Sequence, residues 1–382
     1  MPPSSLYLHI PFCKTKCPYC DFASWSNKED FIDQYFDALI SEIKIKCEVY
    51  NTPVGGGRIG NSRDYSLLRT VFIGGGTPSL VHPDYYKKLF SELKKYFKIS
   101  KDCEITLELN PGTAQKEYLL GYKQLGINRI SIGAQSFNEN ILETLGRKHT
   151  IDETLEAISL VKECGFDNFN LDLIYAVPGM TEEIWTSTIH KALDLNPKHI
   201  SSYSLTIEPN TPFEHIYKNP NSVPDGDFAS DLYFELCNIL KEKGFNHYEI
   251  SNFSRPGFES KHNLNYWIGN EFYAFGVNAH RYLNGLRTSN TKELETYMSN
   301  PSLEIINDFP IDYNFEKIML NSRLNQGFEV NLLNKISKKN QFEITETIKD
   351  LSNLGYLELL DNRIHLTDKG MFVNNEILLR LI

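Results

Sequence analysis

Short apolar runs alternate with amphipathic stretches through the first 206 residues, and this rhythm constrains the fold more than any other feature. The candidate strands are Leu6–Ile10, Thr70–Ile73, Glu104–Leu109, Arg129–Ile132, Asn168–Ile174 and His199–Thr206. The candidate helices are Phe31–Cys47, Asp84–Phe97, Gln115–Leu125, Ile151–Cys164 and Glu182–Leu195. Such alternation predicts parallel strands joined by crossover helices. Because too few units follow for eight strands, we expect an α/β fold with a partial TIM-like barrel.

The pattern changes near residue 310, where a small second domain is expected. Helical candidates and a hairpin follow one another at Tyr313–Asn325, Asn331–Ser337, Ile344–Asn353, Tyr356–Leu360 and Ile364–Thr367. Three helices and a hairpin are typical of a winged-helix-like module. We therefore expect a barrel over residues 1–250, a connecting region over 251–310 and a helical domain over 311–382. The Gly-rich stretch Asn51–Ser66 is expected to be an inserted surface loop.

Charge and cysteine usage narrow the functional class. The net charge of -10 argues against nucleic acid as a partner, so a DNA-binding regulator is the weakest of the functions considered. Without an apolar run of the ~20 residues that a membrane span needs, and without a signal-peptide pattern, we expect a cytoplasmic protein. Of seven cysteines, three crowd into residues 13–20, which we call the cysteine loop. The others are expected to be buried apolar residues: Cys47, Cys103, Cys164 and Cys237.

The spacing Cys13-x3-Cys17-x2-Cys20 follows directly on the first strand. Three thiolates hold a four-iron cluster while leaving one iron without a protein ligand, which a small molecule can then chelate. A structural zinc ion is the alternative, but it takes four protein ligands, and His9 is the nearest further candidate. The sequence therefore predicts a [4Fe–4S] cluster.

The segment around these cysteines, LYLHIPFCKTKCPYCDF, resembles the opening of radical S-adenosylmethionine (SAM) enzymes. It is most similar to the family of oxygen-independent coproporphyrinogen III oxidases. The resemblance extends over nearly the whole chain through seven further motifs: FIGGGTPS (72–79), LELNPGT (107–113), RISIGAQSFN (129–138), LGRKHT (145–150), NLDLIYAVPG (170–179), SYSLTIEPNTP (202–212) and KHNLNYWIG (261–269). It implies a radical SAM barrel that binds a [4Fe–4S] cluster and SAM.

The resemblance also implies which residues contact SAM. They are Tyr7, Gly75, Gly76, Thr77, Glu108, Gln135, Arg147 and Asp172, with Tyr19 shielding the cluster or stacking near the adenine. The residue types suit these roles. Glycines after a strand let a ligand approach the backbone, Glu108 suits the ammonium group and Arg147 suits the carboxylate. Taken alone, each has an ordinary alternative: a tight turn, a solvated strand end and a surface ion pair.

Two departures from the family pattern bear on the activity. The dehydrogenases carry a fourth cysteine two positions after the third, where this chain has Phe22. They also carry a long N-terminal extension, whereas five residues precede Leu6 here. In both respects this chain resembles the heme-chaperone branch of the family. We therefore expect a chaperone that delivers heme to acceptor proteins, including contact with membrane-bound acceptors at the surface, without coproporphyrinogen III dehydrogenase activity. The alternative is that enzyme itself.

The motif His262–Trp267 is the HNxxYW pattern of the heme-chaperone branch. Imidazole is a natural axial ligand of heme iron, and Tyr266 and Trp267 offer flat apolar faces to a porphyrin. The alternative is a packed segment in which His262 is hydrogen-bonded and the two rings fill the core. His262 is our candidate heme ligand.

Replacing Cys13, Cys17 or Cys20 by alanine should each abolish cluster loading, because two thiolates do not hold the cube. Anaerobic reconstitution of the unmodified chain should give about four irons per chain, measured as iron and sulfide content. The matched controls are alanine variants of Cys47, Cys103, Cys164 and Cys237, which should load normally. A fully loaded Cys17→Ala variant would contradict the assignment.

Overall fold

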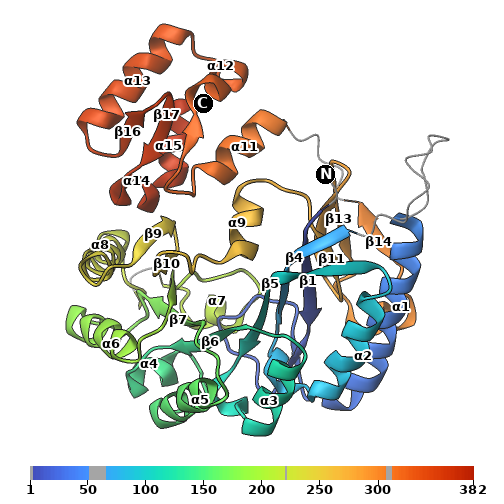
Figure 1. The fold of residues 1–382 in the computed structure, drawn as a ribbon. Helices are drawn as coiled ribbons and strands as arrows, with labels where there is room; N and C mark the ends of the chain where they lie inside the picture. The colour runs from blue at the N-terminus through green and yellow to red at the C-terminus, as the bar shows by residue number, and fades with distance from the viewer. Residues whose placement is uncertain (1–2, 51–65, 220–221, 307–311) are drawn as a thin grey trace, which may run out of the picture.

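The computed structural model describes residues 3–50, 66–219, 222–306 and 312–382, and their strands build one large curved sheet (Figure 1). Within these residues the strand order is β11–β1–β4–β5–β6–β7–β8–β10–β9. The bounds are β1 (Ser5–Ile10), β4 (Ser66–Gly75), β5 (Phe97–Leu109), β6 (Arg129–Gln135), β7 (Phe169–Tyr175), β8 (His199–Ser204), β9 (Asn246–Glu249), β10 (Asn252–Ser254) and β11 (Tyr273–Phe275). From β11 to β8 every pairing is parallel, and β10 and β9 add antiparallel pairs.

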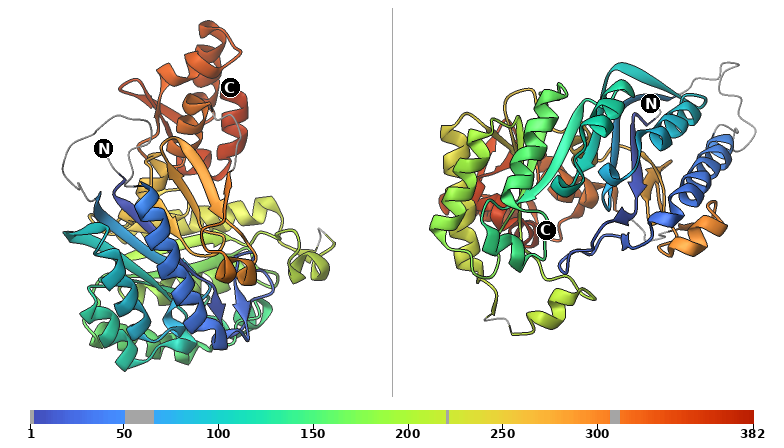
Figure 2. Two further views of the ribbon diagram at one scale, coloured as in Figure 1. Left: turned by 90° about the vertical axis from the view of Figure 1, so that its right-hand side faces the viewer. Right: turned by 90° about the horizontal axis from the view of Figure 1, so that it is seen from below.

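The described strands do not close into a barrel, because β11 and β9 are the two ends of the sheet. This confirms the predicted α/β fold with a partial barrel. Crossover helices cover the outer face (Figures 1 and 2). They are α1 (Ile32–Tyr50), α2 (Pro83–Leu93), α3 (Lys116–Gln124), α5 (Ile151–Glu163), α6 (Glu182–Asp194) and α8 (Gly226–Glu242). Strands on both sides of residue 250 belong to the sheet.

One predicted helix ends earlier than expected. The helix predicted to reach Phe97 stops at Leu93, and Phe97 instead begins β5, opposite Ser66 of β4. The β5 strand is long because its N-terminal half extends the pairing with β4. A local helical pattern does not reveal such a partner, since Ser66 lies about thirty residues away in the sequence.

Side chains along the parallel strands alternate between two environments. In β6, Ile130 and Ile132 pack into the core under the helices, whereas Arg129 and Ser131 face a cavity inside the barrel. In β7, Leu171 faces the helices while its two neighbours in the sequence line the cavity. This period of two places polar groups on the inner face of the sheet. The inner face of the barrel therefore contributes polar groups to the lining of the cavity.

Smaller elements cover the two ends of the barrel. At the carboxyl ends of the strands lie β2 (Phe12–Cys13), β3 (Trp25–Ser26), α4 (Glu139–Thr144) and α7 (Pro212–Ile216). At the opposite end lies α9 (Lys261–Trp267), which carries the HNxxYW motif and contacts β4. Beside α1 lie β12 (His280–Leu283), β13 (Leu286–Asn290), α10 (Leu294–Ser299) and β14 (Glu304–Ile306).

The C-terminal segment has a hydrophobic core of its own, which includes Phe328 and Ile364. Its elements are α11 (Tyr313–Asn321), β15 (Phe328–Glu329), α12 (Leu333–Ile336), α13 (Gln341–Asn353), β16 (Leu357–Leu360), β17 (Arg363–Leu366), α14 (Asp368–Phe372) and α15 (Asn374–Leu381). Asp361 and Asn362 have positive φ angles of 48° and 62°, as a two-residue hairpin turn requires. The predicted hairpin is thus present, and β15 adds a third strand to it.

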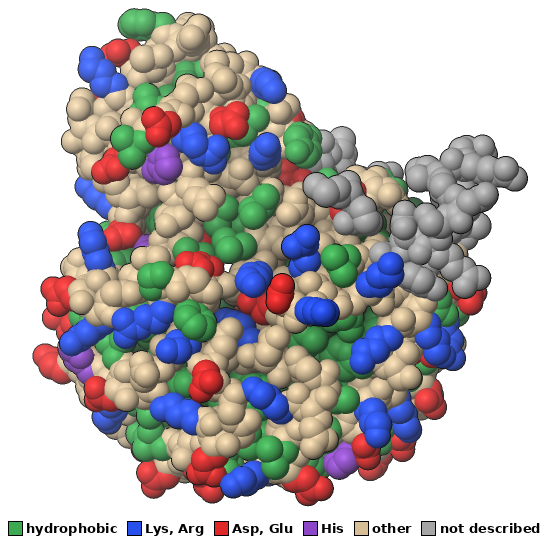
Figure 3. All heavy atoms as spheres, viewed as in Figure 1, with side chains coloured by type: hydrophobic (Ala, Val, Ile, Leu, Met, Phe, Trp, Pro, Cys, Tyr) green, Lys and Arg blue, Asp and Glu red, His purple; other side chains and the backbone are tan. Residues whose placement is uncertain are grey.

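Charged side chains of both signs lie on the face of the molecule seen in Figure 3. On the side seen in Figure 3, lysine and arginine side chains are interspersed with acidic ones rather than gathered into one stripe. Among the described helices, none is long and apolar enough to cross a membrane. The expected inserted loop at Asn51–Ser66 lies outside the described residues, apart from Ser66 in β4.

Candidate functional site

The cysteine loop is held against the end of β4 by backbone hydrogen bonds. The Gly76 amide donates to the Ile10 carbonyl at 2.8 Å, and the Thr77 amide donates to the Phe12 carbonyl at 2.7 Å. The Thr77 hydroxyl lies 3.6 Å from Cys13 Sγ, to which it donates. A Cβ atom at Gly76 would lie 2.8 Å from the Phe12 carbonyl oxygen. Glycine at this position therefore allows β4 to end directly beside the first cysteine.

The rest of the loop is tied at two further points. The Cys20 amide donates to the Cys17 carbonyl at 3.1 Å, which closes a turn between the two cysteines. The Pro18 carbonyl accepts from the Phe213 amide of α7 at 3.1 Å. Burial raises the pKa of the Cys13 and Cys20 thiols, so a bound cation would be needed to favour their thiolate forms.

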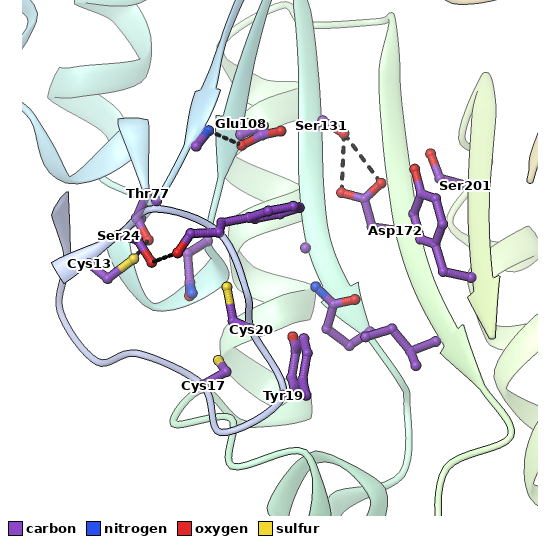
Figure 4. A pocket seen from close by; sticks show the side chains of 18 of the residues that line it. Cys13, Cys17, Tyr19, Cys20, Ser24, Thr77, Glu108, Ser131, Asp172 and Ser201 are labelled. Atoms are coloured by element: carbon purple, nitrogen blue, oxygen red, sulfur yellow. Dashed lines mark hydrogen bonds between the residues drawn. The ribbon is translucent and has the colours of Figure 1, made fainter. Parts of the chain in front are cut away.

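The cysteine loop opens onto a cavity of about 690 Å³ inside the barrel. Figure 4 shows the three sulfur atoms turned toward this space, with Glu108 and Asp172 deeper in it. The lining includes eleven of the twelve cluster and SAM residues expected from the sequence: Cys13, Cys17, Tyr19, Cys20, Gly75, Gly76, Thr77, Glu108, Gln135, Arg147 and Asp172. Loops and strands from positions 13 to 172 thus meet at one site.

Glu108 is a buried carboxyl group beneath the glycine turn. Its Oε2 accepts from the Gly75 amide at 2.9 Å. Burial, together with the nearby Asp172, raises the pKa of Glu108 to about 8. Gly75 has a φ of 121°, and a Cβ atom there would meet the His9 ring at 2.7 Å. An ammonium group placed beside Glu108 would offset the cost of ionising this carboxyl.

Arg147 contacts the cysteine loop. Its Nη1 donates to Cys17 Sγ at 3.4 Å and its Nη2 donates to the Gly133 carbonyl at 3.0 Å. Its Nε is buried without a hydrogen-bond partner. At the end of β6, Gln135 has a φ of 65°, a strained conformation for a residue other than glycine and one that concentrates at functional sites. Tyr19 packs against Phe213 with ring centroids 6.0 Å apart.

Asp172 is held by polar neighbours on the inner face of the sheet. Its carboxylate accepts from Ser131 Oγ at 3.2 Å and from Asn170 Nδ2 at 2.7 Å, and burial raises its pKa. Ser131, Asn170, Ser201 and Arg129 line the cavity but are missing from the residues predicted from sequence. Their signal was present, since polar residues recur at every second position of otherwise apolar strands.

Two predicted residues do not line the cavity. Tyr7 lies in β1, and its hydroxyl is hydrogen-bonded to His9 Nδ1 at 3.0 Å. His262 is 1% exposed at the opposite end of the barrel from the cysteine loop. Its Nδ1 is bonded to Thr70 Oγ1 and its Nε2 to Tyr266 Oη, both at 2.8 Å. Asn263, the next residue of the motif, does line the cavity.

Comparisons with known proteins agree with this geometry. The Radical SAM superfamily matches residues 7–192, and the HemN C-terminal domain matches residues 310–373. The heme chaperone HemW of Lactococcus lactis is 35% identical over 98% of this chain and 96% of its own length. The heme chaperone HemW of Haemophilus influenzae is 36% identical over 99% and 97%. The chain belongs to the HemW family. For this HemW-family chain, the radical SAM domain implies a [4Fe–4S] cluster and SAM as cofactors.

A solved structure supports the fold. Coproporphyrinogen III oxidase (HemN) from Escherichia coli, a radical SAM enzyme, superimposes with a TM-score of 0.81. The alignment covers 99% of this HemW-family chain and 90% of that protein, at 22% sequence identity. At this identity the likeness concerns the fold alone.

The donor set fits a cluster better than a single metal ion. A tetrahedral ion needs its ligand atoms close together, with metal–sulfur bonds of about 2.3 Å. Within the described part of the chain, the ligand atoms of Cys237, His247 and Asp368 all lie within 4.8 Å of one another. The three cysteines of the cysteine loop do not form such a close group. Three sulfur atoms that are spread more widely and face one cavity suit a larger inorganic core.

Replacing Gly76 by alanine should lower cluster loading severalfold. The new Cβ would lie 2.8 Å from the Phe12 carbonyl oxygen and 3.0 Å from Cys13 Sγ, so the loop must move. Iron content after anaerobic reconstitution checks this. Gly226→Ala is the matched control, because nothing lies within 4 Å of a Cβ there. Equal loading of both variants would show that the loop tolerates the displacement.

Proposed function

We propose that this chain is a heme chaperone that binds a [4Fe–4S] cluster, SAM and heme, and transfers the heme to acceptor proteins. The observation that carries the proposal is the similarity to HemW chaperones over 98–99% of the chain. Phe22 adds to it, because an exposed phenylalanine stands where the dehydrogenases have a further cysteine, and its side chain is 66% exposed. We place the protein in the cytoplasm, where its unpaired cysteines would stay reduced.

In this proposal the chain's own residues assemble the cofactors. Cys13, Cys17 and Cys20 would hold the cluster, which when bound supplies an open iron for chelation and a redox centre. The glycine turn at Gly75 leaves its backbone accessible beside Glu108, and this carboxylate would receive the SAM ammonium group.

The tightness of SAM binding should depend on pH through Glu108. Its pKa of about 8 means that the carboxyl is protonated at pH 7 without ligand, and pairing with an ammonium group requires it to ionise. SAM binding should therefore release a proton below pH 8, and the affinity should rise by up to about tenfold per pH unit between pH 6 and 8. Titration calorimetry in buffers of different ionisation enthalpy measures both effects.

Glu108→Gln should bind SAM about ten- to a hundredfold more weakly, through loss of a charge-assisted hydrogen bond, and its affinity should be independent of pH over that range. Glu117→Gln, which removes an exposed carboxylate of α3, is the control and should behave like the unmodified chain. An unchanged pH profile in Glu108→Gln would contradict the role given to Glu108.

His262 stays our candidate heme ligand, and its surroundings set a condition on that role. Burial lowers its pKa to about 3, so the ring is the neutral imidazole that coordinates iron. Both ring nitrogens are hydrogen-bonded, to Thr70 and Tyr266. Coordination would therefore require α9 to shift and at least one of these bonds to break.

Heme added to the purified chain should shift the Soret band and saturate near one heme per chain. If His262 is the ligand, His262→Ala should alter this spectrum, and Tyr266→Phe should tighten binding because it frees Nε2 without removing the ring. His82→Ala is the control, since this half-exposed histidine lies outside the cavity. An absence of saturable heme binding in the unmodified chain would overturn the proposed function.

A further inference from the structure

The cavity contains a buried guanidinium that has no ion-pair partner among the described residues. Arg129 is the first residue of β6, is 2% exposed and lines the cavity. Its Nε has no hydrogen-bond partner, and among the described residues its guanidinium forms no ion pair. A buried unpaired charge is costly unless a partner compensates it. Arg129 therefore marks a place where an anion would be stabilised.

The neighbours of Arg129 are already engaged. Glu104 accepts from the amides of Lys261 and His262 at 3.3 and 3.1 Å, so its carboxylate caps the start of α9. His199 is bonded through Nδ1 to Asn170 Oδ1 at 2.6 Å and through Nε2 to the Tyr248 hydroxyl at 2.7 Å.

The remaining charges near Arg129 are weak or shared. The histidine rings at 199 and 262 are neutral, because burial lowers the pKa of both, and burial raises the pKa of the Tyr248 hydroxyl. The positive charge of Arg129 acts on the Asp172 carboxyl and opposes the rise in its pKa, but the Asp172 oxygens already accept hydrogen bonds from Ser131 and Asn170. The positive charge is left facing the cavity.

The position of Arg129 indicates what kind of ligand could reach it. Arg129 and Gln135 are the two ends of β6 and both line the cavity. Six residue steps of a strand span about 20 Å, so the cavity extends from the cysteine loop to the far end of the barrel. A ligand that enters beside the cysteines can thus place an anionic group against Arg129 only if it spans the length of β6 or sits deep in the barrel.

We propose that Arg129 binds a carboxylate of the ligand that occupies the barrel. The inference rests on the proposed function, which supplies such a group: a propionate of heme. The amino-acid end of SAM is proposed to lie at the glycine turn beside the cysteine loop, at the other end of the cavity. The planar fork of arginine matches a carboxylate with two parallel hydrogen bonds. Arg147, the residue expected from sequence to meet the SAM carboxylate, instead donates to Cys17 Sγ and the Gly133 carbonyl.

The test compares ligands that differ by the carboxylate alone. Heme is paired with heme dimethyl ester, whose propionates are esterified, and SAM is paired with decarboxylated SAM. Arg129→Gln should bind heme about ten- to a hundredfold more weakly while binding the dimethyl ester as tightly as the unmodified chain does. A selective loss for heme assigns the propionate, whereas a loss confined to SAM would overturn the proposal.

Two controls keep the outcome readable. Arg255→Gln removes a guanidinium that stacks on Phe245 outside the cavity and should change neither pair. If Arg129→Gln fails to fold, Arg129→Lys keeps the charge without the fork and should show the same selectivity at smaller size. The unmodified chain should itself prefer the carboxylate-bearing member of the same pair.

Equal affinities for heme and its dimethyl ester, in the unmodified chain and in the variant alike, would overturn the proposal. A chain that binds no heme would refute the proposed function, whereas a chain that binds heme and its dimethyl ester equally would refute the role of Arg129 alone.

Discussion

The alternation of side chains along the parallel strands determines what this barrel can hold. Every second residue of β6 and β7 packs under the helices, and the residues between them face inward. In many barrels the inward positions are filled by bulky apolar side chains that make a packed core. Here several of them are polar, including Ser131, Asn170 and Asp172, and the inward side chains leave a cavity. Because the sheet is open, the cavity has an entrance, and the cysteine loop places its three sulfur atoms there.

The electrostatics of the cavity follow from that burial. Glu108 and Asp172 both lie out of bulk water, and burial raises the pKa of each. Arg129 places a positive charge at the far end. An ammonium group beside Glu108 would compensate the acidic groups, and a carboxylate at the far end would compensate Arg129. The buried charged groups therefore destabilise the cavity without a ligand and favour the binding of a charged ligand.

Much of this arrangement could be predicted from the sequence, because the relevant signals are local. Strand and helix periodicity indicated the partial barrel, and the spacing of Cys13, Cys17 and Cys20 indicated the cluster. What could not be predicted depends on distant partners. The hydrogen bond between His262 and Thr70 joins residues 192 positions apart. That the buried charge of Arg129 lacks an ion-pair partner is evident only once its neighbours are seen to be engaged elsewhere. Likewise, β5 begins at Phe97 because β4 provides a partner.

The central claim is that the cysteine loop presents one open iron of a cluster to the cavity, where SAM reaches it. Mössbauer spectroscopy of the chain reconstituted with ⁵⁷Fe tests this most directly, because coordination of SAM changes the environment of a single iron. The account predicts that SAM shifts the signal of one iron site out of about four while the others keep their parameters. A spectrum that SAM leaves unchanged, in a chain shown by calorimetry to bind SAM, would contradict it.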